Sequence, residues 1–147
     1  MTRAHRVLAG LLLAATLVGL APAPAAAEPV SASDTQAVRA VVEAQLAAFA
    51  ADDGQRAFSY ASPSIRATFG SPERFMAMVR GSYPVVYRPS AVVFLHPVRV
   101  QGQLVQGVHL TDAEGALWFA VYSLERQPDS SWRISGCTVQ PSAGKMT

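Results

Sequence analysis

The change of pattern at Ser90 limits most strongly what this chain can fold into. Before it, apolar residues recur at steps of three and four, which is the period of a helix. After it, runs rich in valine and aromatic residues alternate with short turns, which is typical of strands. Short turns join antiparallel neighbours, since a parallel pair needs a longer crossover. The order predicts the α+β class, with helices packed on a curved antiparallel sheet.

Helix boundaries follow from capping residues and prolines. Ser33 is a candidate cap, with Gln36 three residues later in the spacing of a capping box. Ser71 precedes Pro72, and proline is favoured at the first position of a helix. We predict no helix over residues 83–89, because its prolines favour extended geometry in the residues before them. Helices are expected over residues 33–51, 55–60, 64–69 and 72–81.

Strands are expected over residues 91–100, 104–111, 116–126 and 132–139. Pro97 cannot donate a ladder hydrogen bond, so it predicts a bulge or an edge position in the first strand. Gln101 and Gly102 form a two-residue turn between the first two strands. Each later turn is also short, which predicts a meander in which consecutive strands pair.

Side-chain faces depend on the register of the strands. Placing Thr111 opposite Ala116 puts His109 beside Trp118 on one face. Both faces then carry many apolar residues, whereas a sheet with one wet face alternates more cleanly. We therefore expect the face away from the helices to form a homodimer, or to be covered by the C-terminal tail or by residues 83–89. The predicted dimer contacts are Val108, Leu110, Phe119 and Val121, with Cys137 nearby.

The N-terminus has the composition of a secretory signal peptide. A basic start precedes the uncharged apolar run Val7–Leu20, and the small residues Ala25–Ala27 provide a cleavage site after Ala27. The apolar run is shorter than the roughly 20 residues of a spanning helix. We expect residues 1–27 to be removed and residues 28–147 to form one α+β domain, with its core over 33–139. The protein is then exported, to the periplasm or outside the cell, without stable membrane insertion.

Charge gives no support for nucleic-acid binding, and the cysteine content excludes an internal disulfide. The chain has 12 Lys and Arg against 10 Asp and Glu, and removing Arg3 and Arg6 with the leader balances them. Nothing in this balance favours nucleic acid as a partner. The arginines of residues 54–100 either pair with the acidic first helix or converge on an anionic ligand. Cys137 is the only cysteine, so no internal disulfide forms, and we expect it to be a small buried residue.

Several segments resemble a family of exported bacterial proteins known as domain of unknown function 4864. They are SPSIR at 62–66, FGSPE at 69–73, YPVVYRP at 83–89 and LERQPDSSWRISGC at 124–137. Ser130 stands where the glycine of a Pro-Asp-Gly turn is expected. The resemblance spans about residues 36–139. It implies a cone like that of nuclear transport factor 2 and the SnoaL-type polyketide cyclases, with an apolar mouth, and it implies no established activity.

The sequence gives little support for catalysis. No histidine or carboxylate stands at metal-ligand spacing near His96 or His109, so we expect neither a metal nor a cofactor. Most carboxylates lie in predicted turns or at helix ends, where solvation or the helix dipole explains them. His109 is the one weak candidate for a catalytic acid or base. It supports the alternative hypothesis, a lyase, isomerase or cyclase that uses the cone pocket.

Aromatic residues favour binding over catalysis. Their apolar rings and polar tips are suited to a pocket, although such residues are also common in cores. We expect a non-catalytic exported module that binds a small apolar or weakly anionic ligand, or a partner protein. The predicted binding residues are Tyr87, Arg88, His109, Trp118 and Tyr122.

Overall fold

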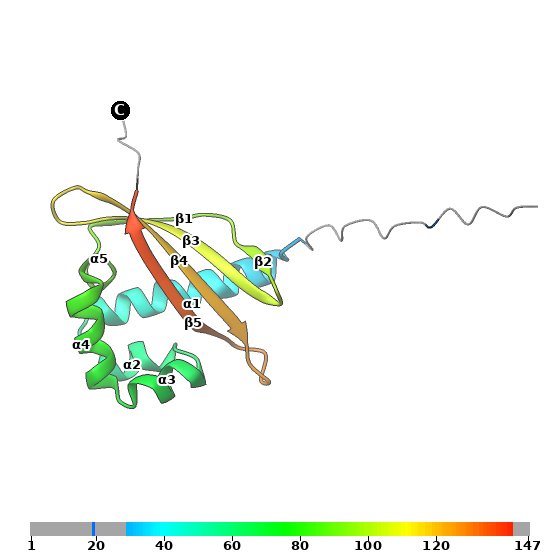
Figure 1. Cartoon of the computed structure of the whole chain (residues 1–147), viewed down its shortest axis with the longest axis horizontal. Helices are drawn as coiled ribbons and strands as arrows, with labels where there is room; N and C mark the ends of the chain where they lie inside the picture. The colour runs from blue at the N-terminus through cyan, green and yellow to red at the C-terminus, as the bar shows by residue number, and fades with distance from the viewer. Residues whose placement is uncertain (1–18, 20–28, 143–147) are drawn as a thin grey trace, which may run out of the picture.

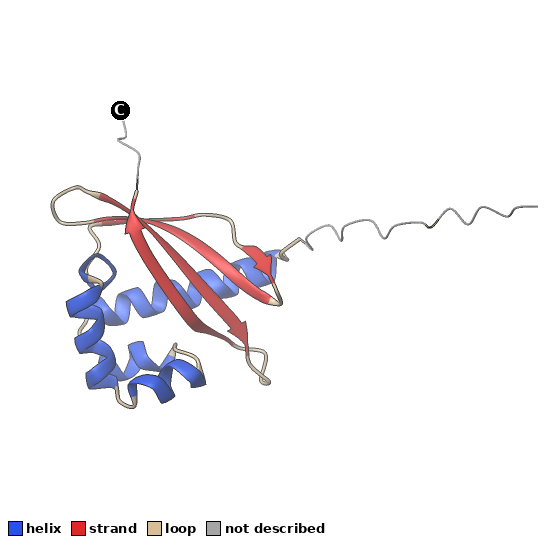
Figure 2. Cartoon of the chain, viewed as in Figure 1, coloured by secondary structure: helices blue, strands red, loops and turns tan. Residues whose placement is uncertain are grey.

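Five helices precede five strands in the computed structural model, which describes residue 19 and residues 29–142 (Figure 1). The helices collect on one face of the sheet, which confirms the α+β prediction (Figure 2). The predicted leader and its cleavage site at Ala27 lie outside the described residues. Within residues 29–142 no helix is long and apolar enough to cross a membrane. The elements are α1 (Ala32–Ala50), α2 (Gly54–Ser59), α3 (Pro63–Phe69), α4 (Pro72–Ser82), α5 (Pro84–Tyr87), β1 (Ala91–Phe94), β2 (Val98–Val100), β3 (Gln103–Thr111), β4 (Leu117–Arg126) and β5 (Trp132–Pro141).

The caps of two helices test the predicted boundaries. The cap of α4 is Ser71, as predicted, and its Oγ accepts the amide of Arg74 at 3.3 Å. The cap of α1 is Ser31, so the prediction of Ser33 was wrong by two residues. Ser31 is extended and its Oγ accepts the amide of Asp34 at 3.0 Å. The helix therefore begins at Ala32, because Ser31, two residues before the predicted cap, serves equally well as a cap.

Helix α5 contradicts the prediction that residues 83–89 contain no helix. Pro84 occupies the first helical position, where its fixed φ suits a helix and its missing amide hydrogen is not needed. Arg88, which precedes Pro89, leaves the helix with φ −146° and ψ 75°. Each proline restricts the residue before it, Tyr83 or Arg88, and both of these residues lie outside the helix. Residues 84–87 are therefore free to form one helical turn.

The sheet is an antiparallel meander in the order β1-β3-β4-β5, with β2 also paired to β3. Pro97 lies in the break between β1 and β2 and divides the single strand predicted over 91–100. Gln101 and Gly102 make the expected turn, both with positive φ, at 49° and 79°. A turn of this handedness matches the twist of the strands it joins.

The register of β3 and β4 differs from the prediction by one residue. Thr111 pairs with Leu117 instead of Ala116, so His109 lies opposite Phe119 and not beside Trp118. The turn is longer because the Asp112 Oδ1 accepts two of its amides and Gly115 adopts a φ of +82°. A shift of one residue moves every side chain of β4 to the other face.

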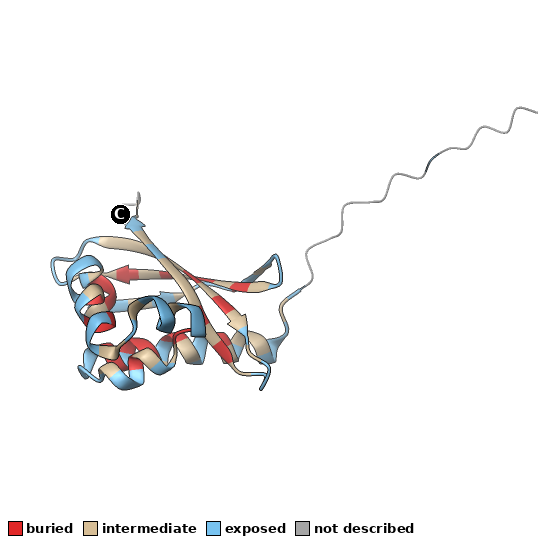
Figure 3. Ribbon diagram, turned by 60° about the horizontal axis from the view of Figure 1, so that its bottom comes forward, coloured by how far each residue is buried: buried red, intermediate tan, exposed pale blue. Residues whose placement is uncertain are grey.

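The core lies between the sheet and the helices, as the buried segments in Figure 3 show. Alternate residues of β3 are buried, among them Val108 and Leu110, both fully inaccessible. They pack in one cluster with Phe49 of α1 and Val86 of α5. The prediction that Val108 and Leu110 form a dimer contact was therefore wrong, because the register places them against the helices.

Candidate functional site

A cavity of about 260 Å³ opens between the helices and the last two strands. Helices α1, α3 and α4 supply most of one side, while β4 and β5 supply the other. Residues 60–62 fix the edge of this second side, since Ile134 donates its amide to Tyr60 and accepts that of Ser62. The lining residues are Gln45, Phe49, Ala61, Ile65, Phe69, Phe75, Met78, Val79, Tyr83, Val86, Tyr122, Ile134, Gly136 and Cys137.

Phe75 is the centre of the aromatic wall of this cavity. Its ring centroid lies 5.9 Å from that of Phe49, 5.5 Å from Phe58 and 5.6 Å from Phe69, all with tilted planes. Tilted aromatic pairs at these distances are favourable beyond the area they bury. The wall is thus a packed cluster of rings drawn from four helices.

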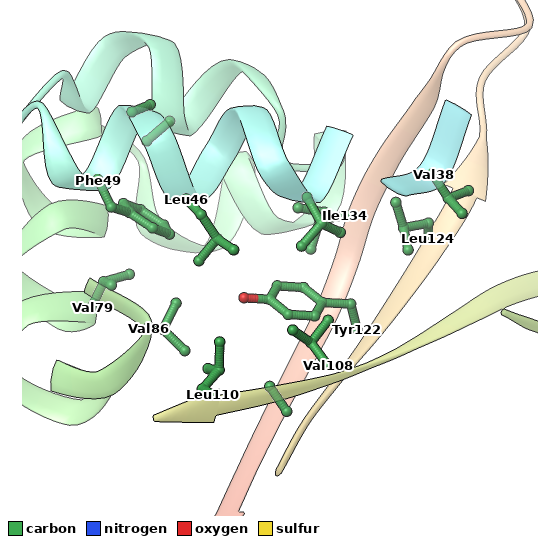
Figure 4. Packing of buried hydrophobic residues seen from close by; sticks show 14 of the residues in the cluster. Val38, Leu46, Phe49, Val79, Val86, Val108, Leu110, Tyr122, Leu124 and Ile134 are labelled. Atoms are coloured by element: carbon green, nitrogen blue, oxygen red, sulfur yellow. The ribbon is translucent and has the colours of Figure 1, made fainter. Parts of the chain in front are cut away.

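Tyr122 is the polar group in the depth of the cavity. Its side chain is 1% exposed, and among the described residues its hydroxyl makes no hydrogen bond of normal geometry, although the weakly hydrogen-bonding Cys137 thiol lies beside it. Figure 4 shows the hydroxyl pointing away from β4 toward Phe49 and Val86. Burial raises the pKa of Tyr122 well above its ordinary value, and the neighbouring Cys137 thiol raises it further. Tyr122 is therefore a neutral donor at physiological pH.

The remaining lining is neutral as well. Burial raises the pKa of the Cys137 thiol to about 12, and the nearby Tyr122 hydroxyl offsets only part of that effect. Gln45 is buried and donates its Nε2 to the carbonyl of Ala57 at 3.1 Å. Among the residues that the structure describes, no Asp, Glu, Lys or Arg lines the cavity. The site can hold an apolar molecule and form hydrogen bonds with it, but it offers no charge.

Tyr87 and Arg88, which the sequence predicted as binding residues, belong to a surface cluster instead. Tyr87 donates to the Asp52 carboxylate, which also pairs with Arg80 at 3.2 Å and with Arg88 at 3.0 Å. These bonds, led by that of Tyr87, hold the pKa of Asp52 below its ordinary value. Arg99 also pairs with Asp34 of the first helix, at 3.7 Å. These ion pairs favour the prediction that the arginines pair with the acidic N-terminal segment over the prediction that they converge on an anionic ligand.

Trp118 lies outside the cavity too. It lines a second hollow of about 350 Å³, between α5 and the turn after β3, together with Arg88, Asp112 and Tyr83. Its indole Nε1 donates to the Asp112 Oδ2 at 2.9 Å. Trp118 thus helps to hold the turn that sets the register of β4.

The Asp112 carboxylate should make stability depend on pH. The hydrogen bond from Trp118, followed by that from the amide of Ala116, lowers the pKa of Asp112 in the folded protein. A lowered folded-state pKa stabilises the fold above the unfolded pKa of about 4, and this stabilisation is lost as pH falls through the folded pKa. We expect Asp112→Asn to unfold more easily than the wild type at pH 7 and to lose less stability on acidification. Urea titrations at pH 7 and pH 3 measure the difference, and parallel pH dependences of the two proteins would contradict it.

His109 is on the opposite face of the sheet from the cavity. It alternates with the buried Val108 and Leu110, and its ring centroid lies 5.1 Å from that of Phe119. Over residues 29–142 no three His, Cys, Asp or Glu side chains gather where they could hold a metal ion. The cavity therefore lacks the acid or base that the enzyme hypothesis assigned to His109.

Only Tyr122 of the five predicted binding residues lines the cavity. Its other walls come from apolar positions of α1, α3, α4 and β5, which in the sequence are indistinguishable from ordinary core residues. Gln45 gave no signal either, because the helical period places it with Arg39 and Glu43 on the polar side of the helix, whereas the structure buries it.

Comparisons with known proteins agree with this architecture. The model of a family described as a domain of unknown function, DUF4864, matches residues 31–147. No curated protein matches the chain. A crystal structure from Streptomyces avermitilis, provisionally named a dehydratase of the NTF2-like family, is 16% identical with a TM-score of 0.51, over 76% of this chain and 98% of that one. An NTF2-like protein of unknown function from Burkholderia xenovorans LB400 is 14% identical with a TM-score of 0.46, over 76% and 88%. The fold is NTF2-like.

Proposed function

Because this chain belongs to the DUF4864 family, whose description gives no activity, we propose its function from the site: an exported, non-catalytic module that binds a small apolar ligand in the cavity. The cavity itself carries the proposal. Its walls are almost entirely apolar, and a few polar groups among apolar walls are typical of small-molecule sites. Export follows from the leader, and an N-terminus at Glu28 in the secreted protein tests it.

The lining argues against two of the other hypotheses, an anionic ligand and an enzyme. None of the arginines between residues 29 and 142 lines the cavity, so a weakly anionic ligand has no counter-charge from them there. A lyase or isomerase needs a group that accepts a proton near neutral pH, whereas Tyr122 and Cys137 both keep their protons. The dehydratase name of the Streptomyces protein belongs to a chain only 16% identical, which supports the fold alone.

Filling the cavity tests the proposal. Cys137→Phe adds a ring to the cavity wall on β5, while Thr138→Phe adds the same ring to an exposed position one residue away. We expect apolar compounds found in a thermal-shift screen to stabilise the wild type and Thr138→Phe, and to have no effect on Cys137→Phe. A screen without a stabilising compound, or one in which both variants respond equally, would contradict a ligand site at this place.

We also propose that a second copy of the chain covers the outer face of the sheet. Large apolar side chains on this face are 41% to 59% exposed, namely Val93, Leu95, Val98 and Val100. Phe119 and Val121 lie on the same face, opposite His109 and Gly107 in the register. None of these side chains is charged, so two copies can meet without like-charge repulsion. Light scattering should give the mass of two chains, reduced to one by Phe119→Glu, and a single-chain mass in the wild type would contradict the dimer.

A further inference from the structure

We propose that the ligand is a neutral ring compound with one hydroxyl or carbonyl oxygen, and that the Tyr122 hydroxyl donates a hydrogen bond to this oxygen. The inference rests on the proposed function, because it concerns the same cavity. It adds the chemical class of the ligand and the residue that recognises it.

The state of the Tyr122 hydroxyl supports the hydrogen bond. Buried polar groups in proteins nearly always have a partner, and leaving one unpaired is costly. Over residues 29–142 the Tyr122 hydroxyl makes no hydrogen bond of normal geometry, and the Cys137 thiol beside it is only a weak hydrogen-bonding group, whereas Gln45, a second buried polar residue, is bonded to the carbonyl of Ala57. The hydroxyl points toward Phe49 and Val86 (Figure 4), two residues that line the cavity. A ligand oxygen is therefore the partner that the fold itself does not supply.

The surroundings of Tyr122 support a neutral ligand. A carboxylate in the cavity would lose its hydration without gaining a cation, and burying an unpaired charge is far more costly than burying a polar group. The two arginines of the surface cluster, Arg80 and Arg88, already share the carboxylate of Asp52. Burial also keeps the thiol of Cys137 protonated, so the cavity does not offer a negative partner to a cationic ligand.

The volume limits the size of the ligand. A cavity of roughly 150 Å³ binds benzene, and drug-sized ligands occupy about 300 Å³ or more. The cavity of about 260 Å³ therefore suits one substituted ring or a small fused pair. The rings of Phe49, Phe69 and Phe75 line it and favour contact with an aromatic or alicyclic surface.

Three probes of one shape test this inference by calorimetric titration of the purified protein. They are 4-methylphenol, which carries the oxygen, p-xylene, which replaces it with a methyl group, and 4-methylbenzoate, which is charged. Each is titrated into the wild type, into Tyr122→Phe, and into Tyr60→Phe as a control that removes a hydroxyl from a half-buried tyrosine outside the cavity lining. Circular dichroism checks that each variant is folded.

We expect Tyr122→Phe to weaken 4-methylphenol by roughly 3- to 10-fold, the value of one neutral hydrogen bond. The affinity for p-xylene should stay unchanged, Tyr60→Phe should resemble the wild type, and 4-methylbenzoate should bind at least about 10-fold more weakly than 4-methylphenol. If p-xylene binds but Tyr122→Phe leaves 4-methylphenol unaffected, the hydrogen bond is disproved while the apolar site stands. If 4-methylbenzoate binds as well as 4-methylphenol, the requirement for a neutral ligand is disproved. If no probe binds, the proposed function fails with the inference.

Discussion

Phe75→Ala is expected to lower the free energy of unfolding by about 3–5 kcal/mol, which is the usual cost of removing a buried phenylalanine ring. The side chain is 6% exposed and contacts the rings of Phe49, Phe58 and Phe69. Its removal takes away three aromatic contacts at once. It also enlarges a cavity that is already present, and the three neighbouring rings are held by three different helices, so they can close the space only in part. Urea denaturation measures the loss.

The matched control for Phe75 is on the same helix. Arg74 is exposed and contributes no side-chain hydrogen bond that the structure shows, so Arg74→Ala should change stability by no more than about 0.5 kcal/mol. A loss of less than about 1 kcal/mol for Phe75→Ala would mean that the aromatic wall is not part of the core. The cavity would then be a feature of a loosely packed surface, and the site built on it would lose its support.

Tyr122→Phe is expected to raise the free energy of unfolding of the ligand-free protein by about 1 kcal/mol. The substitution keeps the ring and removes only a hydroxyl that is buried without a partner in the protein, and such groups cost about 1–3 kcal/mol. The same variant should bind an oxygen-bearing ligand less well. A residue that costs stability while serving binding is a common property of functional sites.

Tyr60→Phe is the control for Tyr122→Phe, because Tyr60 is only half-buried and water can reach it. Its stability should equal that of the wild type within about 0.5 kcal/mol. If Tyr122→Phe is instead destabilised by 1 kcal/mol or more, the hydroxyl has a partner in the folded protein and is not kept for a ligand. Chemical denaturation at pH 7 distinguishes the two results.

The parts of the fold that depend on neighbouring residues could be predicted from the sequence. The cap at Ser71 and the turn at Gln101 and Gly102 each follow from a few adjacent residues. The class of the fold followed from the same source, since helical and strand patterns occupy separate halves of the chain. These features need no knowledge of how distant segments pack.

The register between β3 and β4 could not be predicted in this way. It depends on the Asp112 side chain, which accepts the amides of Glu114 and Ala116 and so lengthens the turn. The error was one residue, but it exchanged the two faces of β4. It grouped Val108 and Leu110 with Phe119 at a subunit interface and placed His109 beside Trp118. In the structure Val108 and Leu110 lie in the core, and His109 pairs with Phe119.

The candidate site, like the fold, could be predicted from the sequence only in part. Tyr122 was predicted because its apolar ring and polar tip are suited to a pocket. The remaining walls could not be predicted, since whether Ile65, Phe69 or Met78 fills the core or borders a cavity depends on how four helices meet the sheet. Tyr87 and Arg88 were plausible from residue type alone, and the contact with Asp52, 35 and 36 residues away in the chain, assigns them to the surface.

Amide chemical-shift mapping of the 15N-labelled protein during titration with 4-methylphenol tests the central claim most directly, because it locates the ligand without a mutation. The predicted changes are concentrated at Ala61, Ile134, Gly136 and Cys137, which line the cavity. The outer face of the sheet, at His109 and Val121, should remain unchanged. Changes confined to the outer face, or spectra that do not respond to the ligand at all, would contradict a binding site between the helices and the sheet.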